Sequence, residues 1–301
     1  MSSIEDRFRE LHPKSKPLAD KANSLFADGV THVSRQMSPY PIYMERGQGA
    51  NKWDVDGNEY IDYKTGHGSM ILGQAHPAVV KAVQDQMANG TPLSSGTRLE
   101  VEWGDVVTRL VPSVEKLRFV GSGTESLMMA FKMARVFAGK EKIVKFAGAF
   151  HGWGDTAYVT DEKTDRQYGI PRGTSAAVIN APPHDLDALD EILTSNNDIA
   201  AVTFQGNDIA RPEFLTGLRE LTTSHGVLLI FDEVVSGFRW SNAGAQGRFG
   251  ITPDLSTFAK ILAGGLPGGA VGGRADVINT VGEGGIRHPG TFNANPISAA
   301  A

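Results

Sequence analysis

The spacing of apolar residues changes once within the first 65 positions. Between residues 4 and 28 apolar side chains recur as on one face of a helix, with prolines at positions 13 and 17 interrupting the pattern. From Ile42 to Tyr63 apolar and polar residues alternate around the turn Val55-Asp-Gly-Asn58, which is typical of a hairpin. The pattern predicts two short helices and a small sheet in an N-terminal segment of residues 1–65.

Beyond residue 65, segments with helical spacing alternate with short apolar runs. The segments with helical spacing predict helices over about 78–88, 98–110, 124–137, 185–194 and 212–224. The short apolar runs predict strands at Lys116–Val120, Lys142–Phe146, Ala176–Ile179, Ala200–Thr203, Val227–Phe231 and Ala270–Gly273. The polar segment 160–175 contains Gly and Pro, which favours a surface loop that could act as a lid. The alternation is typical of an α/β domain with a mostly parallel sheet, here residues 66–301.

The composition narrows the class of partner. The chain has 301 residues, a net charge of −5 and no block of Lys or Arg, which argues against nucleic acid or a membrane and favours a small-molecule substrate. Cysteine is absent, which excludes disulfides and a thiolate nucleophile. No histidine has partners at metal-ligand spacing, so no metal site is predicted. The charged N-terminus and the lack of a long apolar run predict a cytoplasmic protein without a signal peptide.

The apolar run Val227–Phe231 leads directly into Asp232 and Glu233. Such acids lie at the carboxyl end of a buried strand, which is the usual ligand edge of an open α/β sheet. One suitable partner for Asp232 is a protonated pyridine nitrogen, such as that of the cofactor pyridoxal 5'-phosphate (PLP), and the ion pair would keep that ring electron-withdrawing. An ordinary salt bridge at a strand end is the alternative interpretation.

Lys260 stands between Phe258-Ala259 and Ile261-Leu262, ahead of a glycine-rich stretch. Its apolar neighbours suggest a buried side chain, and desolvation lowers the pKa of an amine. A neutral amine is what a Schiff-base nucleophile requires. A lysine that extends from a helix end into solvent is the alternative.

Two further segments have features of a cofactor site. The turn Gly121-Ser122-Gly123 precedes a helix that starts near Thr124, so backbone amides, two hydroxyls and the helix dipole could hold a phosphate. A simple helix cap is the alternative. Phe150 follows a strand and could stack on a flat ring, with His151 hydrogen-bonding nearby, although core packing explains the aromatic residue equally well.

These features occur in an order that resembles the class III (subgroup II) PLP-dependent aminotransferases, and among them the glutamate-1-semialdehyde 2,1-aminomutases most closely. The resemblance is carried by WDVDGNEYIDY, RFVGSGTES, KIVKFAGAFHGWGD, LLIFDEVVSGFR, PDLSTFAKILAGGLPGGAVGGR and GTFNANP. It implies fold-type I, in which a large α/β domain with a mostly parallel seven-stranded sheet joins a small N-terminal segment. It also implies PLP at a homodimer interface and a C-terminal small domain, which we expect to be missing here.

The resemblance assigns a role to each candidate residue. Lys260 matches the Schiff-base lysine, which also shuttles the substrate proton, and Asp232 matches the acid on the pyridine nitrogen. The other matches are the phosphate-binding Ser122, Gly123 and Thr124, Phe150 on one ring face, Val234 on the other, and Thr291, which reaches the phosphate of the neighbouring subunit. Arg35 falls where the aminomutases have a substrate-carboxylate arginine, although a surface arginine is the alternative. His67 stands where they have a tryptophan.

Three functions remain open on the sequence. The leading hypothesis is an aminotransferase that moves an amino group from an amine or amino acid to a carbonyl acceptor. The alternative is an intramolecular aminomutase, which needs no acceptor and is favoured by Arg35. A PLP-binding protein without catalysis is a minor alternative, because Lys260, Asp232 and the phosphate turn are all intact. His67, and the lack of the family's usual Glu-Pro between Ala200 and Asn207, indicate a substrate pocket that differs from that of the aminomutases.

Overall fold

The computed structural model divides into two compact units, residues 1–80 and 81–301, and describes residues 3–208, 211–282 and 285–301. The boundary expected between residues 65 and 66 stays a prediction. In the smaller unit, the two expected helices are α1 (Ile4–Leu11) and α2 (Ser15–Leu25), and the chain between them contains Pro13. Pro17 does not interrupt a helix, because it lies in the first turn of α2, where an amide N–H has no intrahelical acceptor.

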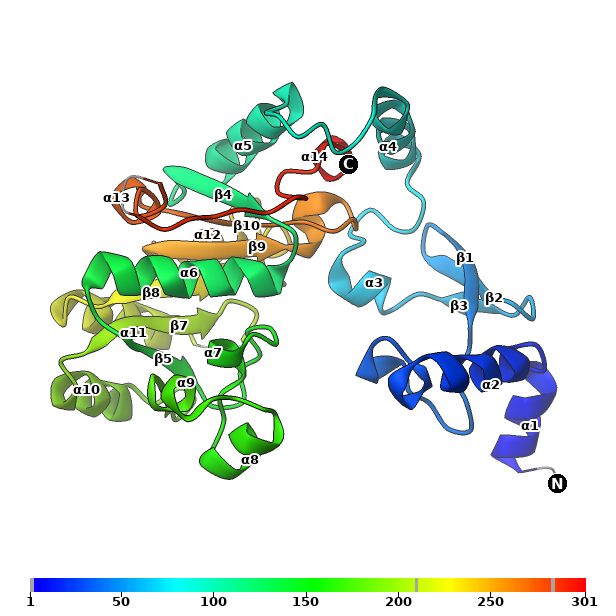
Figure 1. Ribbon diagram of the computed structural model, residues 1–301, viewed down its shortest axis with the longest axis horizontal. Helices are drawn as coiled ribbons and strands as arrows, with labels where there is room; N and C mark the ends of the chain where they lie inside the picture. The colour runs from blue at the N-terminus through cyan, green and yellow to red at the C-terminus, as the bar shows by residue number, and fades with distance from the viewer. Residues whose placement is uncertain (1–2, 209–210, 283–284) are drawn as a thin grey trace. The chain divides into compact units, whose positions relative to one another are not determined.

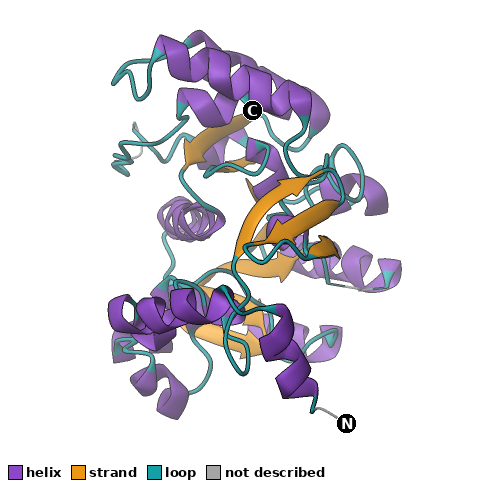
Figure 2. Cartoon of the chain, turned by 90° about the vertical axis from the view of Figure 1, so that its right-hand side faces the viewer, coloured by secondary structure: helices purple, strands orange, loops and turns teal. Residues whose placement is uncertain are grey.

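The alternating segment of the smaller unit forms a three-stranded antiparallel sheet, and its strands are among the strands drawn in orange in Figure 2. Its strands are β1 (Met44–Gln48), β2 (Asn51–Asp54) and β3 (Glu59–Ile61). In the predicted hairpin turn, buried Asp54 accepts hydrogen bonds from the amides of Asp56 at 3.0 Å and Asn58 at 2.8 Å. The hairpin is confirmed, and β1 extends it by one strand. Short irregular turns follow at η1 (Ala27–Gly29), η2 (Val33–Arg35) and α3 (Thr65–Gly68).

The larger unit is built on a seven-stranded sheet with the order β4-β10-β9-β8-β7-β5-β6 (Figure 1). Strand β10 runs antiparallel to both of its neighbours, and the other pairings are parallel, which confirms the mostly parallel sheet. The strands are β4 (Lys116–Val120), β5 (Lys142–Phe146), β6 (Val178–Ala181), β7 (Ile199–Gln205), β8 (Leu228–Asp232), β9 (Leu255–Ala259) and β10 (Gly269–Gly273).

Helices cover both faces of this sheet. One face packs against α6 (Gly123–Ala138) and α13 (Ala275–Ile278), and the other packs against α5 (Arg98–Leu110), α10 (Leu186–Ser195) and α11 (Pro212–Ser224). Strands buried on both sides need apolar residues at successive positions, which explains the continuous apolar runs. The remaining helices are α4 (Pro77–Asn89), α7 (Asp155–Tyr158), α8 (Glu162–Gln167), α9 (Arg172–Ala176), α12 (Gly244–Phe249), η3 (Lys260–Ala263) and α14 (Pro296–Ala300).

Two sequence-based expectations need correction. The segment 160–175 is not a loop: it contains α8 and most of α9, because Asp165, only 2% exposed, accepts from the amide of Thr160 at 2.7 Å and from the Ser175 hydroxyl. Strand β9 was missed, because its polar residues Ser256 and Thr257 interrupt the apolar run. Both are fully buried.

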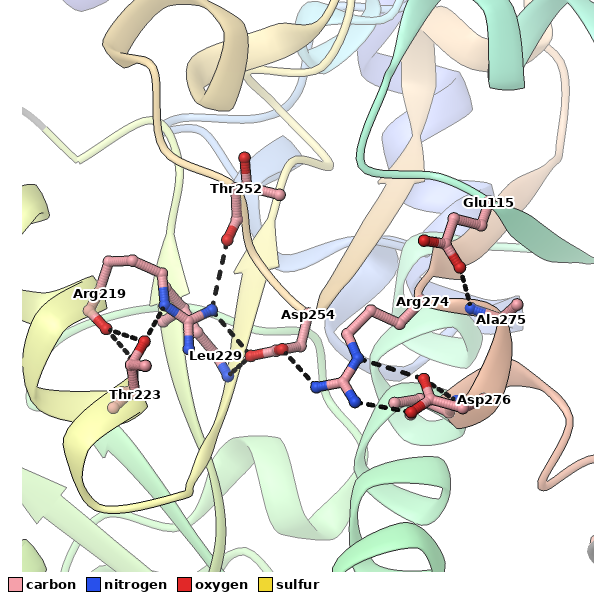
Figure 3. Close-up of polar contacts among 11 residues, drawn as sticks. Glu115, Arg219, Thr223, Leu229, Thr252, Asp254, Arg274, Ala275 and Asp276 are labelled. Carbon is pink, nitrogen blue, oxygen red and sulfur yellow. Dashed lines mark hydrogen bonds and ion pairs between the residues drawn. The ribbon is translucent and has the colours of Figure 1, made fainter.

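A carboxylate at the amino end of β9 ties this strand to two helices (Figure 3). Asp254 accepts from Arg219 of α11 at 2.8 Å and from Arg274, next to α13, at 2.9 Å. It also accepts from the buried amide of Leu229 at 2.8 Å, and Arg274 continues to Asp276 at 2.6 Å. This cluster holds the amino end of β9, at the edge of the sheet opposite Lys260.

Candidate active site

The candidate residues of the larger unit follow strands that end at one edge of the sheet. Strands β4, β5, β7, β8 and β9 run in the same direction, since β10 is antiparallel to both β4 and β9. Gly269 of β10 pairs with both Val120 and Ala259, which places the turn after β4 and Lys260 two strands apart. The carboxyl ends of parallel strands form the ligand edge of such sheets.

Asp232 is the last residue of β8 and is 4% exposed. Its Oδ2 lies 2.8 Å from Nδ1 of His151, and its Oδ1 accepts from the amide of Val234 at 3.1 Å and lies 3.5 Å from the hydroxyl of Thr257. A carboxylate can only accept, so His151 carries a proton on Nδ1. Its Nε2 is buried and has no hydrogen-bond partner among the described residues.

Lys260 follows β9 directly and has a backbone φ of 54°, in the left-handed region that is costly for a residue with a Cβ. Backbone strain of this kind is concentrated at functional sites. Burial lowers the pKa of the Lys260 amine, while the charge of Asp232 raises it and that of Arg239 lowers it. The site therefore holds more neutral amine near neutral pH than an exposed lysine would.

The predicted phosphate turn packs against this edge. Helix α6 begins at Gly123, where amide groups lack intrahelical acceptors, and Ser122 caps it by accepting from the amide of Glu125 at 3.3 Å. A Cβ on Gly123 would lie 3.0 Å from both methyl groups of Val234 and 3.4 Å from Cβ of Ala259. The turn is thus brought against Val234 and the residue that precedes Lys260.

The segment after β5 also reaches the turn. A Cβ on Gly152 would lie 2.7 Å from Oγ1 of Thr124, so the backbone next to His151 passes close to the start of α6. The Phe150 side chain is 61% exposed, and its amide donates to Oε1 of Gln205 at 3.3 Å. Sequence reasoning missed the contacts of Gln205 and Thr257. Both residues lie on strands that flank β8 and pair with Asp232, which could have suggested them.

Thr291 belongs to the larger unit and is exposed. It lines a cavity of about 780 Å³ together with polar groups that include Ser94, Arg118, His288 and Asn293. Nε of Arg118 donates to Nδ1 of His288 at 3.3 Å. Burial, followed by the charge of Arg118, lowers the pKa of His288.

Arg35 and His67 both belong to the smaller unit. Arg35 is exposed and donates to the hydroxyl of Thr31 at 2.8 Å. The ring of His32 stacks on that of His67, with centroids 4.9 Å apart. The structure thus brings the segment that carries Arg35 close to His67.

No helix within residues 3–208, 211–282 and 285–301 combines the length and apolar character needed to cross a membrane. The same residues contain no group of three His, Asp or Glu side chains arranged to hold a metal. His184 and His225 each contact a single acid, Asp208 at 3.0 Å and Asp190 at 2.8 Å.

The residues at the sheet edge fit PLP. The Asp232 carboxylate has three donors around it and room for about one more, and among the described residues its ion pairs include only His151. A protonated pyridine nitrogen would satisfy it. Gly123 leaves the start of α6 free of a side chain that would collide with Val234, and a helix start suits a phosphate.

The comparison with known families agrees with this site. The aminotransferase class-III family matches residues 32–301, so the chain belongs to the class III aminotransferases, which are PLP-dependent enzymes. The sequence-based expectations of family, enzyme class and cofactor are thereby confirmed.

Individual relatives are similar over almost the whole chain. It is 42% identical to the glutamate-1-semialdehyde 2,1-aminomutase of Roseiflexus castenholzii, over 96% of this chain and 70% of the relative. An ω-transaminase from Sphaerobacter thermophilus superposes with a TM-score of 0.90 at 35% identity, over 95% of this chain and 70% of that one. A transaminase with PLP bound superposes with a TM-score of 0.90 at 32% identity, over 99% of this chain and 72% of that one.

Proposed function

We propose that this enzyme is an aminotransferase that moves an amino group from an amine or amino acid to a carbonyl acceptor, with Lys260 as its catalytic residue. The observation that carries the proposal is the buried Asp232–His151 contact of 2.8 Å at the sheet edge where Lys260 also lies. An acid fixed by a histidine, beside a lysine whose pKa is lowered by burial, suits chemistry on a cationic heteroaromatic ring.

PLP supplies, when bound, an electron-withdrawing ring that stabilises negative charge at the reacting carbon. Asp232 keeps the ring nitrogen protonated, and His151 holds the carboxylate in one orientation. Lys260 acts first as the nucleophile and then as the general base and acid that moves the proton at the reacting carbon. Its lowered pKa increases the share of neutral amine that both steps require.

Other residues have binding roles in this proposal. Ser122, Gly123 and Thr124 hold the phosphate at the start of α6, and Phe150 and Val234 lie on opposite ring faces. The exposure of Phe150 leaves its ring face accessible. Thr291 contacts the phosphate of a second copy in a homodimer, which is consistent with its own exposure and with the exposed ring of Phe292. A cytoplasmic location is proposed for a chain that contains no cysteine.

An aminomutase is the second candidate, because the Roseiflexus relative bears that name. Arg35 would then bind the carboxylate of an amino-aldehyde, since a guanidinium pairs with a carboxylate through two hydrogen bonds. His67, close to the Arg35 segment, would contribute to the same pocket.

The two candidates differ in whether an external acceptor is needed. The PLP-loaded protein is mixed with a panel of amines and amino acids without acceptor, and the absorbance change to the pyridoxamine form is followed. We expect conversion with release of a carbonyl product. Turnover of an amino-aldehyde alone, with no acceptor, would establish the aminomutase instead. The absence of both reactions would contradict the proposal of catalysis.

A further inference from the structure

The residue after Asp232 has a hydrogen-bond network of its own. Glu233 is 0% exposed and takes part in none of the ion pairs found among the described residues. Its Oε1 accepts from the backbone amide of Gln246 at 2.9 Å and from the side-chain amide at 3.3 Å. Its Oε2 accepts from the amide of Ala245 at 2.9 Å and from the Ser236 hydroxyl. Burial raises the pKa of Glu233 above its ordinary value, and these hydrogen bonds offset only part of that rise.

These contacts join the two ends of a loop, residues 233–246, at the carboxylate of Glu233. Ser236 lies three residues after Glu233, whereas Ala245 and Gln246 lie twelve and thirteen residues after it. Compact loops whose ends lie close together in this way are Ω-loops. A Cβ on Gly244 would lie 2.7 Å from Cδ of Glu233, so the backbone approaches the carboxylate where a larger residue would collide with it.

Two side chains of the loop interact with residues of the candidate site. Val234 packs against Gly123 of the phosphate turn, and Arg239 is close enough for its charge to lower the pKa of Lys260. The amide of Arg239 donates to the carbonyl of Ser236 at 3.1 Å, and its Nε donates to the carbonyl of Val235 at 3.1 Å. Arg239 is therefore hydrogen-bonded, through its amide and its guanidinium, to the turn that Glu233 holds through Ser236.

The network also continues into the sheet. The side-chain amide of Gln246 donates to Oγ of Ser256 at 3.0 Å, and its carbonyl oxygen accepts from the Ser113 hydroxyl. Ser256 belongs to β9, four residues before Lys260. The far end of the loop is thus fixed to the strand that positions the lysine.

We propose that Glu233 is a positioning residue for the reaction: its carboxylate fixes the loop 233–246, which keeps Val234 and Arg239 in place near Lys260. This inference rests on the proposed role of Lys260. Glu233 itself touches neither substrate nor cofactor. Its effect is transmitted through Ser236, Ala245 and Gln246.

The alternative is that Glu233 acts on Lys260 only through its negative charge, and the two possibilities predict opposite signs. In Glu233→Gln the side chain keeps one acceptor oxygen, so the amides of Ala245 and Gln246 cannot both be satisfied and the loop loosens. Displacement of Arg239 removes a positive charge, which raises the pKa of Lys260. Loss of the Glu233 charge alone would lower it.

The test titrates Lys260 in the apoprotein, by measuring with mass spectrometry how fast an amine-reactive reagent labels it as a function of pH. The midpoint should rise in Glu233→Gln and also in Arg239→Gln, and the double variant should show no additional rise. The matched control is Glu220→Gln, an exposed acid on α11, which should leave the midpoint unchanged. An unchanged or lower midpoint in Glu233→Gln, or additive shifts in the double variant, would overturn the proposal.

This readout does not depend on turnover, so it separates the inference from the proposed function. A wild-type protein that fails the amino-donor assay refutes the function, whereas the Lys260 titration still tests the loop. In the loaded enzyme, kcat/KM of Glu233→Gln should fall, by up to about 100-fold for a displacement near 1 Å. If Glu233→Gln does not fold, Ser236→Ala removes a single donor and should shift the Lys260 midpoint in the same direction.

Discussion

Nδ1 of His151 lies 2.8 Å from Oδ2 of Asp232, and both side chains are buried. The two residues are 81 positions apart and come from the segment after β5 and from the end of β8. The contact fixes the tautomer of the histidine and the orientation of the acid at once. Asp232 is therefore held by a ring N–H, while its second oxygen faces the amide of Val234 and the hydroxyl of Thr257.

Replacing Asp232 with Asn should preserve PLP binding but reduce kcat by orders of magnitude, because a neutral amide cannot keep the ring nitrogen protonated. Cofactor content is measured by absorbance after dialysis, and kcat is measured with the best donor from the panel. Near-normal turnover would refute the role of Asp232.

Replacing Lys260 with Ala should abolish the visible absorption band of lysine-bound cofactor, since no other amine is assigned to this position. The spectrum of the variant reconstituted with PLP is compared with that of the wild type before and after borohydride reduction. A covalent cofactor adduct that forms in the variant after reduction would exclude Lys260 as the attachment site.

Replacing Arg35 with Ala should raise KM for carboxylated donors much more than for simple amines. The variant loses the guanidinium group, which forms a bidentate, charged hydrogen-bonded pair with a carboxylate but not with a simple amine. Steady-state kinetics with matched pairs of amino acids and amines measure the difference. Equal effects on both classes would indicate a structural arginine.

Replacing Asp254 with Ala should lower the free energy of unfolding by about 2–3 kcal/mol, because two arginines lose a shared carboxylate and the buried Leu229 amide loses its acceptor. Urea unfolding measures the change. Asp276→Ala is the matched control, since it removes a half-exposed partner of the same Arg274 and should cost less than about 1 kcal/mol. Equal losses would show that burial of Asp254 is unimportant.

The contribution of Asp62 to stability should depend on pH. Burial raises the pKa of Asp62, but hydrogen bonds from Gln74 at 2.8 Å and Lys52 at 3.2 Å, with others, lower it below the usual 3.8. Because the folded pKa lies below the unfolded one, the stabilisation is complete above pH 3.8 and is lost as the pH falls through the folded value. Thermal unfolding should show Asp62→Asn less stable than wild type at neutral pH, with a difference that shrinks in acid. A constant difference would contradict this assignment.

Strands and helices with simple patterns could be read from the sequence. Lys116–Val120 and Lys142–Phe146 are strands with the predicted bounds, and residues 212–224 form α11 as expected. Strand β9 could not be read in this way, because Ser256 and Thr257 look like surface residues until their partners Gln246 and Asp232 are known. The prediction of a loop over residues 160–175 was wrong for the same reason. Buried Asp165 accepts hydrogen bonds from Thr160 and Ser175, and the sequence does not show these partners.

The sequence by itself determined the fold class, the family motifs and the identities of the candidate residues, because strand periodicity and short motifs are local properties of the chain. Only the tertiary structure decided which groups meet: His151 with Asp232, Gly123 with Val234, and Glu233 with the far end of its loop. These contacts join distant positions, and their geometry depends on the order in which strands pack in the sheet. Local sequence patterns therefore do not reveal individual contacts of this kind, which form only when the whole fold is assembled.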